Sequence, residues 1–294
     1  MSDPWAGLEG RPLAAATGPF PGGPFLSVWW RHFGAGEPLV VAEAGCTLGL
    51  VRRGDAVSFA GDPEVTDYHS PLGPNPEPAV QALAAGIGPG VSISLDSLPA
   101  EAASALDDAL RRAGLASTGP VRHEAAMVID DAATYPGLLP AKQRHEVRRK
   151  RRRFEESVGP PSLAREDGEI EAFLAMHRRS PGDKGSFMTP AMAAFFVDLL
   201  DTVPGASLQV LRDGAGSVAA AAFGFEDDEA YYLYNSSFDP DLSGTSPGIV
   251  LVDALIRDRG ECAARRFDFL KGTETYKLRL GARSRPLFRL EVTV

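Results

Sequence analysis

The sequence predicts a mixed α/β fold with mixed sheets, arranged as two consecutive domains. Each half of the chain runs through a helix, antiparallel strands, and then further helix and strand segments. The chain has 294 residues, whereas a single domain usually has roughly 100–200. Hydrophobic residues make up 44% of it, which is enough for a sizeable core. No residue-level repeat accompanies the similar order of elements.

The N-terminal domain is expected over residues 25–137, after an irregular arm over 1–24 that is rich in Gly, Pro and Ala. Short apolar runs bounded by glycine predict strands, and amphipathic runs predict helices. The predicted elements are a helix over 25–33, strands over 39–44, 47–51 and 56–59, a helix over 79–85, a strand over 91–95, a helix over 99–113 and a strand over 124–129.

The second domain is expected over residues 138–294. It opens with a charged helix over 138–156, which Gly159-Pro160-Pro161 ends. The elements predicted after it are helices over 169–178 and 190–200, strands over 207–212, 218–225 and 230–235, a helix over 247–259, and strands over 266–270 and 286–292.

Composition excludes several classes of protein. The formal charge of −9 argues against binding of nucleic acid or anionic membranes by the protein as a whole. The two cysteines, Cys46 and Cys262, show no metal-binding spacing, so no metal site is predicted. The apolar runs are far shorter than the roughly 20 residues of a membrane span, and the N-terminus has no basic segment followed by an apolar one. We therefore expect a soluble, cytoplasmic protein; its oligomeric state stays open.

The segment around Ser246 has the features of a helix start. The Ser246 hydroxyl is suited to accept a first-turn amide, Pro247 fits the first helical position, and Gly248 lets an external group approach the backbone. A helix N-terminus of this kind attracts anions. An ordinary capped helix explains the same residues, and from the motif alone we favour that interpretation, because Ser-Pro-Gly is not a specific phosphate-binding signature.

Five motifs follow one another in the second half, and their order is informative. They are Tyr-Asn-Ser at 234–236, Asp-Pro at 239–240, Ser-Pro-Gly at 246–248, Arg-Phe-Asp-Phe-Leu-Lys-Gly at 266–272 and Tyr-Lys at 276–277. Together they resemble the GNAT-like acetyltransferases of the CelD/BcsL type, which are related to the Fem-type peptidoglycan aminoacyltransferases. The resemblance is strongest over residues 207–283.

The resemblance implies tandem GNAT-like (acyl-CoA N-acyltransferase) domains, with the acyl-donor site in the second one. It implies acetyl-CoA as the donor, lying where one strand splays from its neighbour. The cofactor-binding residues that it implies are Tyr234, Asn235 and Ser236 at the acyl end, and Ser246, Pro247, Gly248 and Ile249 around the pyrophosphate. Ser-Pro-Gly stands here in place of the usual Arg/Gln-x-x-Gly-x-Gly/Ala loop, so an aminoacyl-tRNA or another thioester stays an alternative donor.

Three residues near the predicted strand 266–270 are candidates for catalysis. Asp268 points away from its apolar neighbours and is a candidate base, with Lys271 as its partner or as a contact for an anionic substrate. Tyr276 is a candidate acid toward the departing thiolate, and Lys277 is a candidate substrate contact. A structural Asp–Lys pair and a packed tyrosine are the alternatives.

Basic residues in two places are candidates for binding the acceptor or an anionic ligand. His177 and Arg178 lie at a predicted helix end, where the helix dipole alone also explains them. The charged helix offers Arg148 and Arg152. Its eight basic residues are Lys142, Arg144, Arg148, Arg149, Lys150, Arg151, Arg152 and Arg153. Either the helix is a solvated face or it binds a polyanion, and we favour an anionic substrate or cofactor over nucleic acid.

The sequence thus predicts an N- or O-acyltransferase that moves an acyl group, in the first place acetyl, from a coenzyme A thioester to an amine or hydroxyl. The acceptor is expected to be an anionic small molecule or a sugar, and transfer to be direct. One alternative is a Fem-type transferase, the only case in which tRNA would be a partner. The other is a non-catalytic GNAT-like binding protein. No DNA partner is expected, because no helix-turn-helix is recognisable.

Overall fold

The computed structural model describes residues 3–261 and 266–294, so Cys262 lies outside the described residues. The chain forms two compact units. Unit 1 contains Met1–Ala126 and Arg285–Val294, and unit 2 contains Met127–Ser284. The last ten residues, which the sequence placed in the second domain, join unit 1 because strand β11 (Arg283–Thr293) pairs antiparallel with β4 (Ser92–Leu98). This pairing is non-local, and hydrophobic periodicity does not reveal it.

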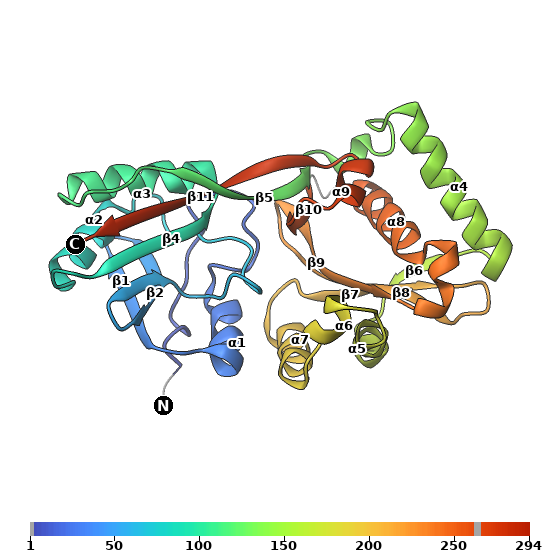
Figure 1. Cartoon of the computed structure of the whole chain (residues 1–294), viewed down its shortest axis with the longest axis horizontal. Helices are drawn as coiled ribbons and strands as arrows, with labels where there is room; N and C mark the ends of the chain where they lie inside the picture. Colours follow the sequence, from blue (N-terminus) through green and yellow to red (C-terminus); the bar gives the residue numbers. More distant parts are fainter. Residues whose placement is uncertain (1–2, 262–265) are drawn as a thin grey trace. The chain divides into compact units, whose positions relative to one another are not determined.

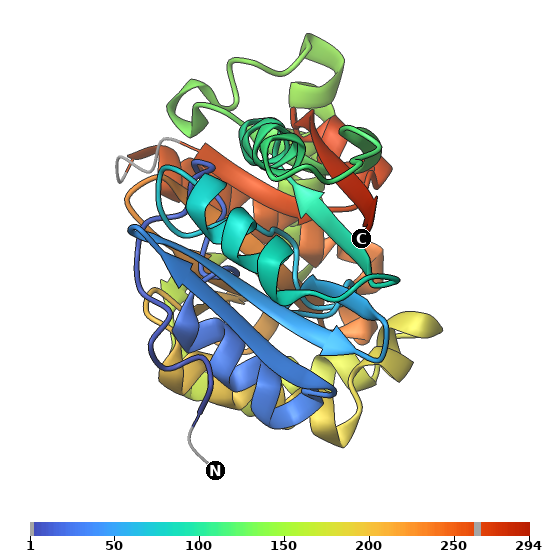
Figure 2. The same cartoon turned by 90° about the vertical axis from the view of Figure 1, so that its left-hand side faces the viewer.

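Unit 1 is a mixed sheet with helices on it. Its strands follow the order β1-β2-β3-β4-β11, with β3 and β4 parallel and the other neighbours antiparallel. Figure 2 faces this unit and shows α2 lying against the strands β1 and β2. Its further elements are α1 (Gly23–Phe33), β1 (Glu37–Glu43), β2 (Cys46–Arg53), β3 (Ala56–Phe59), α2 (Glu77–Gly86), α3 (Ala100–Arg112) and β5 (Val121–Ile129), whose last three residues lie in unit 2.

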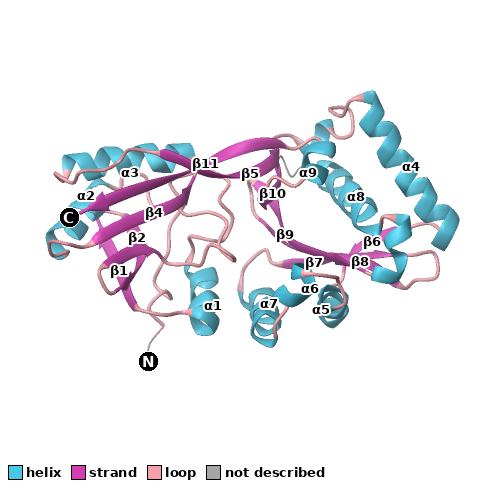
Figure 3. Cartoon of the chain, in the orientation of Figure 1, coloured by secondary structure: helices cyan, strands magenta, loops and turns pink. Residues whose placement is uncertain are grey.

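The N-terminal arm is irregular, yet its aromatic residues are packed into unit 1. Trp5 and Phe20 have no exposed surface. The Trp5 ring lies 5.7 Å from that of Trp30, and the Phe20 ring lies 5.0 Å from that of Phe25, both on α1. The arm therefore belongs to the core of unit 1, although it forms no helix or extended strand over residues 3–22 (Figure 3).

Unit 2 carries the motifs that point to chemistry. Its strands follow the order β10-β9-β8-β7-β6, antiparallel except for the parallel pair β9 and β10. Its elements are η1 (Ala132–Thr134), α4 (Ala141–Val158), β6 (Ser162–Arg165), η2 (Asp167–Glu169), α5 (Ile170–Arg178), α6 (Asp183–Phe187), α7 (Pro190–Thr202), β7 (Ser207–Arg212), β8 (Val218–Glu226), β9 (Ala230–Phe238), η3 (Pro240–Thr245), α8 (Pro247–Glu261), β10 (Arg266–Lys271) and α9 (Thr275–Arg279).

Helices cover both faces of this sheet, α4 and α8 on one side and α5, α6 and α7 on the other (Figure 1). The core under α8 includes Phe154 of α4, Tyr231 and Leu233 of β9, and Leu255. The opposite face is aromatic: the Phe196 ring of α7 packs edge-on against that of Phe223, 5.1 Å away. The mixed α/β class predicted from the sequence is confirmed.

Residues 3–261 and 266–294 contain neither a membrane-spanning helix nor a metal-binding cluster. None of the helices there is long and apolar enough to cross a membrane. Within the same residues, His, Cys, Asp and Glu side chains form no group that could hold a metal ion. Cys46 is buried in unit 1 as a free thiol.

Candidate functional site

The strands β9 and β10 separate part-way along their length. They pair in parallel from Arg266↔Ala230 to Asp268↔Tyr232, although β9 continues to Phe238 and β10 to Lys271. Leu270 has φ +60°, a left-handed conformation that non-glycine residues rarely adopt. The backbone of β10 thus turns out of the strand conformation two residues after its last pair with β9. The two strands therefore separate beyond Asp268 and Tyr232, which is where the resemblance implied a gap between neighbouring strands.

A β-bulge in β9 lies at the same level. Leu233 is opposite Gly224 and Asn235 is opposite Phe223, so Tyr234 is the additional residue. The Tyr234 ring lies 5.6 Å from that of Phe196 on α7, and Asn235 bonds to a residue of α5. Both side chains therefore lie on the face that α5 and α7 cover. Bulges commonly re-aim side chains beside active sites.

The start of α8 differs in detail from the predicted helix cap. Ser246 is left-handed, with φ 60° and ψ 47°, and its carbonyl oxygen accepts the amides of Ile249 and Val250 at 3.1 and 3.2 Å. Its hydroxyl accepts a hydrogen bond from the ammonium of Lys150, 3.2 Å away. At Gly248 an added Cβ would lie 3.3 Å from the Phe238 ring. Because glycine has no side chain, the backbone of the loop stays accessible to a ligand.

Lys150 on α4 is the basic residue that reaches this loop, and the sequence did not single it out. It lies three residues after Val147 and four before Phe154, both buried, so it shares their side of the helix. The two arginines that the sequence favoured, Arg148 and Arg152, are exposed, and Arg152 is 3.5 Å from Glu156. The spacing from the buried pair is the signal that would have identified Lys150.

The loop and Lys150 together can attract an anion. A helix N-terminus carries partial positive charge, but two first-turn amides here are already bonded to Ser246. The ammonium of Lys150 adds a full positive charge at the same place. A phosphate group would therefore be held as much by this side chain as by the backbone.

His177 on α5 is brought to the bulge of β9. Its ring is 1% exposed, and Nε2 lies 3.0 Å from Oδ1 of Asn235. Burial lowers the pKa of His177, and the positive charge of Lys184 lowers it further. The imidazole is therefore neutral at pH 7. Arg178, the other predicted acceptor contact, is exposed at the end of the same helix.

The lowered pKa of His177 makes stability depend on pH. The unfolded chain binds a proton at His177 near pH 6.5, whereas the folded protein does so only at lower pH. The contribution of His177 is complete above about pH 6.5 and is lost as the pH falls through the folded-state pKa. We expect the free energy of unfolding to fall between pH 7 and pH 5 more steeply in the wild type than in His177→Phe. Urea titrations of both proteins measure this, and parallel curves would contradict it.

The turn after β10 has a structural network. Asp268 has no exposed surface, and its Oδ1 accepts the amide of Leu270 at 2.7 Å, across the left-handed residue. Lys277 is 3% exposed and its Nζ donates to the carbonyl oxygens of Lys271 and Gly272 at 2.6 and 3.2 Å. Tyr276 packs on Phe269 with ring centres 6.2 Å apart, and burial raises its pKa. The structure thus places the predicted residues Asp268, Lys271, Tyr276 and Lys277 together at one turn.

Lys277→Met tests the structural role of that lysine. Methionine fills a similar space but removes the donor to the partly buried carbonyl oxygens of Lys271 and Gly272 and the ion pair with Glu274, so we expect the free energy of unfolding to fall by about 1–3 kcal/mol. Chemical denaturation measures the change. Lys277→Ala is not a suitable control, because it also creates a cavity; Arg279→Met, on the exposed side of α9, should be close to neutral.

A parallel strand pair that opens beside an anion-binding helix start is the arrangement of the GNAT class. The comparisons agree: residues 141–278 match the model of the acetyltransferase (GNAT) domain family. The matched segment contains the strands β9 and β10, Lys150 and the loop at the start of α8 (residues 246–248, the α8 loop). No protein of curated function matches the chain significantly.

Solved structures with the same fold extend over both units. One is the C-terminal domain of a putative lysylphosphatidylglycerol synthetase from Agrobacterium fabrum, with TM-score 0.58, 13% identity, and coverage of 91% of this chain and 87% of that one. A second is L-PGS from Bacillus licheniformis, with TM-score 0.61, 12% identity, and coverage of 97% and 93%. FemX has TM-score 0.58, 11% identity, and coverage of 88% and 89%. These similarities show a common fold.

Proposed function

We propose that the protein is an acyltransferase that uses a coenzyme A thioester, in the first place acetyl-CoA, and acylates an amine or hydroxyl. The observation that carries this proposal is the separation of β9 from β10 after Asp268↔Tyr232, next to a loop where Lys150 bonds to Ser246. The separation frees backbone groups of β9 for a ligand, and the loop suits its phosphates.

The residues of the chain have distinct roles in this proposal. Lys150, Ser246 and Gly248 hold the donor's phosphates, and the donor supplies the activated acyl carbonyl. Backbone amides of β9 beyond Tyr232 stabilise the oxyanion that forms on that carbonyl. Asp268 is a positioning residue, because its carboxylate holds the Leu270 turn at which β10 leaves β9.

Proton transfer is assigned to two side chains on different elements. The imidazole of His177 donates from Nε2 to Oδ1 of Asn235, which leaves Nδ1 as the nitrogen that would accept the proton an amine loses on acylation. Tyr276 is assigned as the donor to the departing thiolate, because it lies at the turn after β10; burial raises its pKa, which makes it a weaker acid than an exposed tyrosine. Transfer is direct, since donor and acceptor meet at the bulge.

A Fem-type reaction is the second candidate. It is favoured by the fold similarity to FemX over 88% of the chain and to L-PGS over 97%. In that case the exposed basic residues of α4, such as Arg148 and Arg153, would bind RNA. Binding would then weaken steeply as the salt concentration rises.

Calorimetric titration with acetyl-CoA, followed by an assay of thiol release with a panel of amines and sugars, tests the proposal. Saturable binding and acceptor-dependent thiol release are expected. Binding of charged tRNA instead, lost at high salt, would replace coenzyme A by the Fem-type donor. Failure of both donors would favour a non-catalytic binding protein.

A further inference from the structure

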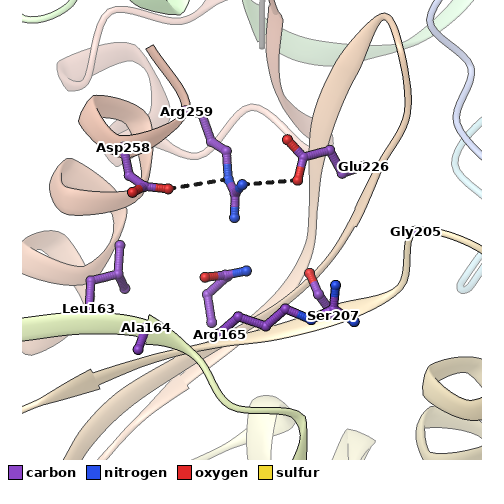
Figure 4. A pocket seen from close by; sticks show the side chains of 9 residues that line it. Leu163, Ala164, Arg165, Gly205, Ser207, Glu226, Asp258 and Arg259 are labelled. Carbon is purple, nitrogen blue, oxygen red and sulfur yellow. Dashed lines mark hydrogen bonds and ion pairs between the residues drawn. The ribbon is translucent and has the colours of Figure 1, made fainter. Parts of the chain in front are cut away.

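Unit 2 contains a pocket at the C-terminal end of α8. Its volume is about 440 Å³, within the range of small-molecule sites. Nine residues from β6, β7 and the turn before it, the end of β8 and the last turns of α8 line it (Figure 4), namely Leu163, Ala164, Arg165, Gly205, Ser207, Gln209, Glu226, Asp258 and Arg259. Arg259 is twelve residues after Pro247, so about 18 Å of helix separates this pocket from the α8 loop.

Two neighbouring polar side chains in this pocket are buried without a partner. Ser207 is 3% exposed and Gln209 is 4% exposed, and both lie on one face of β7. The Ser207 hydroxyl is fully enclosed and makes no hydrogen bond with any residue that the structure describes. The Gln209 side chain makes none with the same residues, although its amide is not fully enclosed as the Ser207 hydroxyl is; its register partner on β6 is Arg165. Burying polar groups without hydrogen bonds is unfavourable, so these two point to a ligand.

Charged side chains surround these two residues, and their formal charges cancel. Arg259 donates from Nη1 to Glu226 at 2.9 Å and lies 3.7 Å from Asp258. Figure 4 shows its guanidinium reaching into the pocket between these two carboxylates. Arg165 bonds through Nε and Nη2 to Asp167, outside the pocket lining. Two cations and two anions thus line one small space.

The wall beside Ser207 is fixed by a glycine. Gly205 has φ +79°, and an added Cβ would lie 2.1 Å from the Glu226 carbonyl oxygen. The Glu226 amide donates to the Gly205 carbonyl oxygen at 3.0 Å. This close backbone contact sets the position of Glu226 relative to Ser207, and a larger residue would displace it.

We infer that this pocket is a second small-molecule site, for a free amino acid. The carboxylate accepts hydrogen bonds from the Ser207 hydroxyl, the Gln209 amide and a guanidinium N–H, since guanidinium and carboxylate geometries match. The ammonium group lies toward Glu226 and Asp258. A zwitterion satisfies the buried polar groups without adding net charge to a lining that is already balanced. This inference does not depend on the proposed donor or reaction.

Ligand-observed NMR with the twenty common L-amino acids on the full chain tests it, with acetate and methylammonium as probes of each half of the zwitterion. At least one amino acid is expected to bind, and to bind at least about tenfold more weakly to Gln209→Met and to Ser207→Ala. Gln209→Met should unfold at the same temperature as the wild type or higher, because it removes an unpaired buried amide.

Three results would overturn the inference: no amino acid binds, acetate or methylammonium binds equally well, or binding survives unchanged in both variants. Lys150→Glu separates this site from the donor site. It should bind the amino acid as the wild type does, whether or not the protein binds acetyl-CoA.

Discussion

Lys150→Glu is expected to weaken binding of acetyl-CoA by about 100-fold or more. Losing a hydrogen bond to a charged partner weakens binding by about 1.5–3 kcal/mol, which is about 10- to 150-fold. A carboxylate in place of the ammonium, which now lies 3.2 Å from the Ser246 hydroxyl, adds repulsion with the phosphates. Calorimetry gives the dissociation constant directly. Lys150→Arg should retain most of the affinity, because it keeps the charge.

Arg152→Glu is the matched control for this substitution. It makes the same change of charge two residues away, on a side chain that is 72% exposed and already next to Glu156. Its effect on donor binding should be small, because solvent and salt screen exposed charges. Equal losses in both variants would mean that the helix acts through its total charge, and Lys150 would then have no special role.

Gly248→Trp is expected to abolish measurable binding of acetyl-CoA while leaving the fold intact. The glycine lies in the first turn of α8, and an added Cβ would be 3.3 Å from the Phe238 ring. An indole there occupies the surface that the phosphates need. A small side chain requires only a slight shift of Phe238, so Gly248→Ala should bind with modest loss. Titration of Gly248→Trp and Gly248→Ala with acetyl-CoA distinguishes two causes of lost binding. Loss in the tryptophan variant alone means that the loop is blocked, whereas equal loss in both means that the helix is disrupted.

Gly168→Trp controls for the general effect of an added tryptophan. Nothing lies within 4 Å of a Cβ at this exposed position of unit 2. It should bind acetyl-CoA like the wild type. Retained binding in Gly248→Trp would mean that the donor approaches elsewhere, and the assignment of the α8 loop would be wrong.

Much of the fold could be predicted because its elements have strong local patterns. The helix over 247–259 and the strands over 207–212 and 218–225 correspond closely to α8, β7 and β8. The strand β6 and the helices α6 and α9 were not predicted, since the helices have only five residues each and β6 has a single large apolar side chain, Leu163. The partner of β11 was not predictable either, because strand pairing joins residues almost 200 positions apart, such as Glu291 and Ser94.

The elements of the candidate site could be predicted from the sequence, but the contacts between them could not. The sequence indicated an anion site at Ser246 and a basic helix, but it did not indicate that a residue of this helix, Lys150, contacts Ser246. Helical phase shows in retrospect which basic residue faces inward, since Val147 and Phe154 are the buried residues of α4. The left-handed conformation of Ser246 and the bulge at Tyr234 depend on tertiary packing, and no local residue pattern specifies them.

Hydrogen exchange with and without acetyl-CoA tests the central claim most directly. If the donor lies where β9 and β10 separate, amides in residues 234–238 of β9 and 246–250 of α8 become more protected when it binds. The pocket lined by Ser207 and Gln209 should be unchanged. Protection confined to other parts of the chain, or no change at saturating acetyl-CoA, would contradict a donor site between these strands.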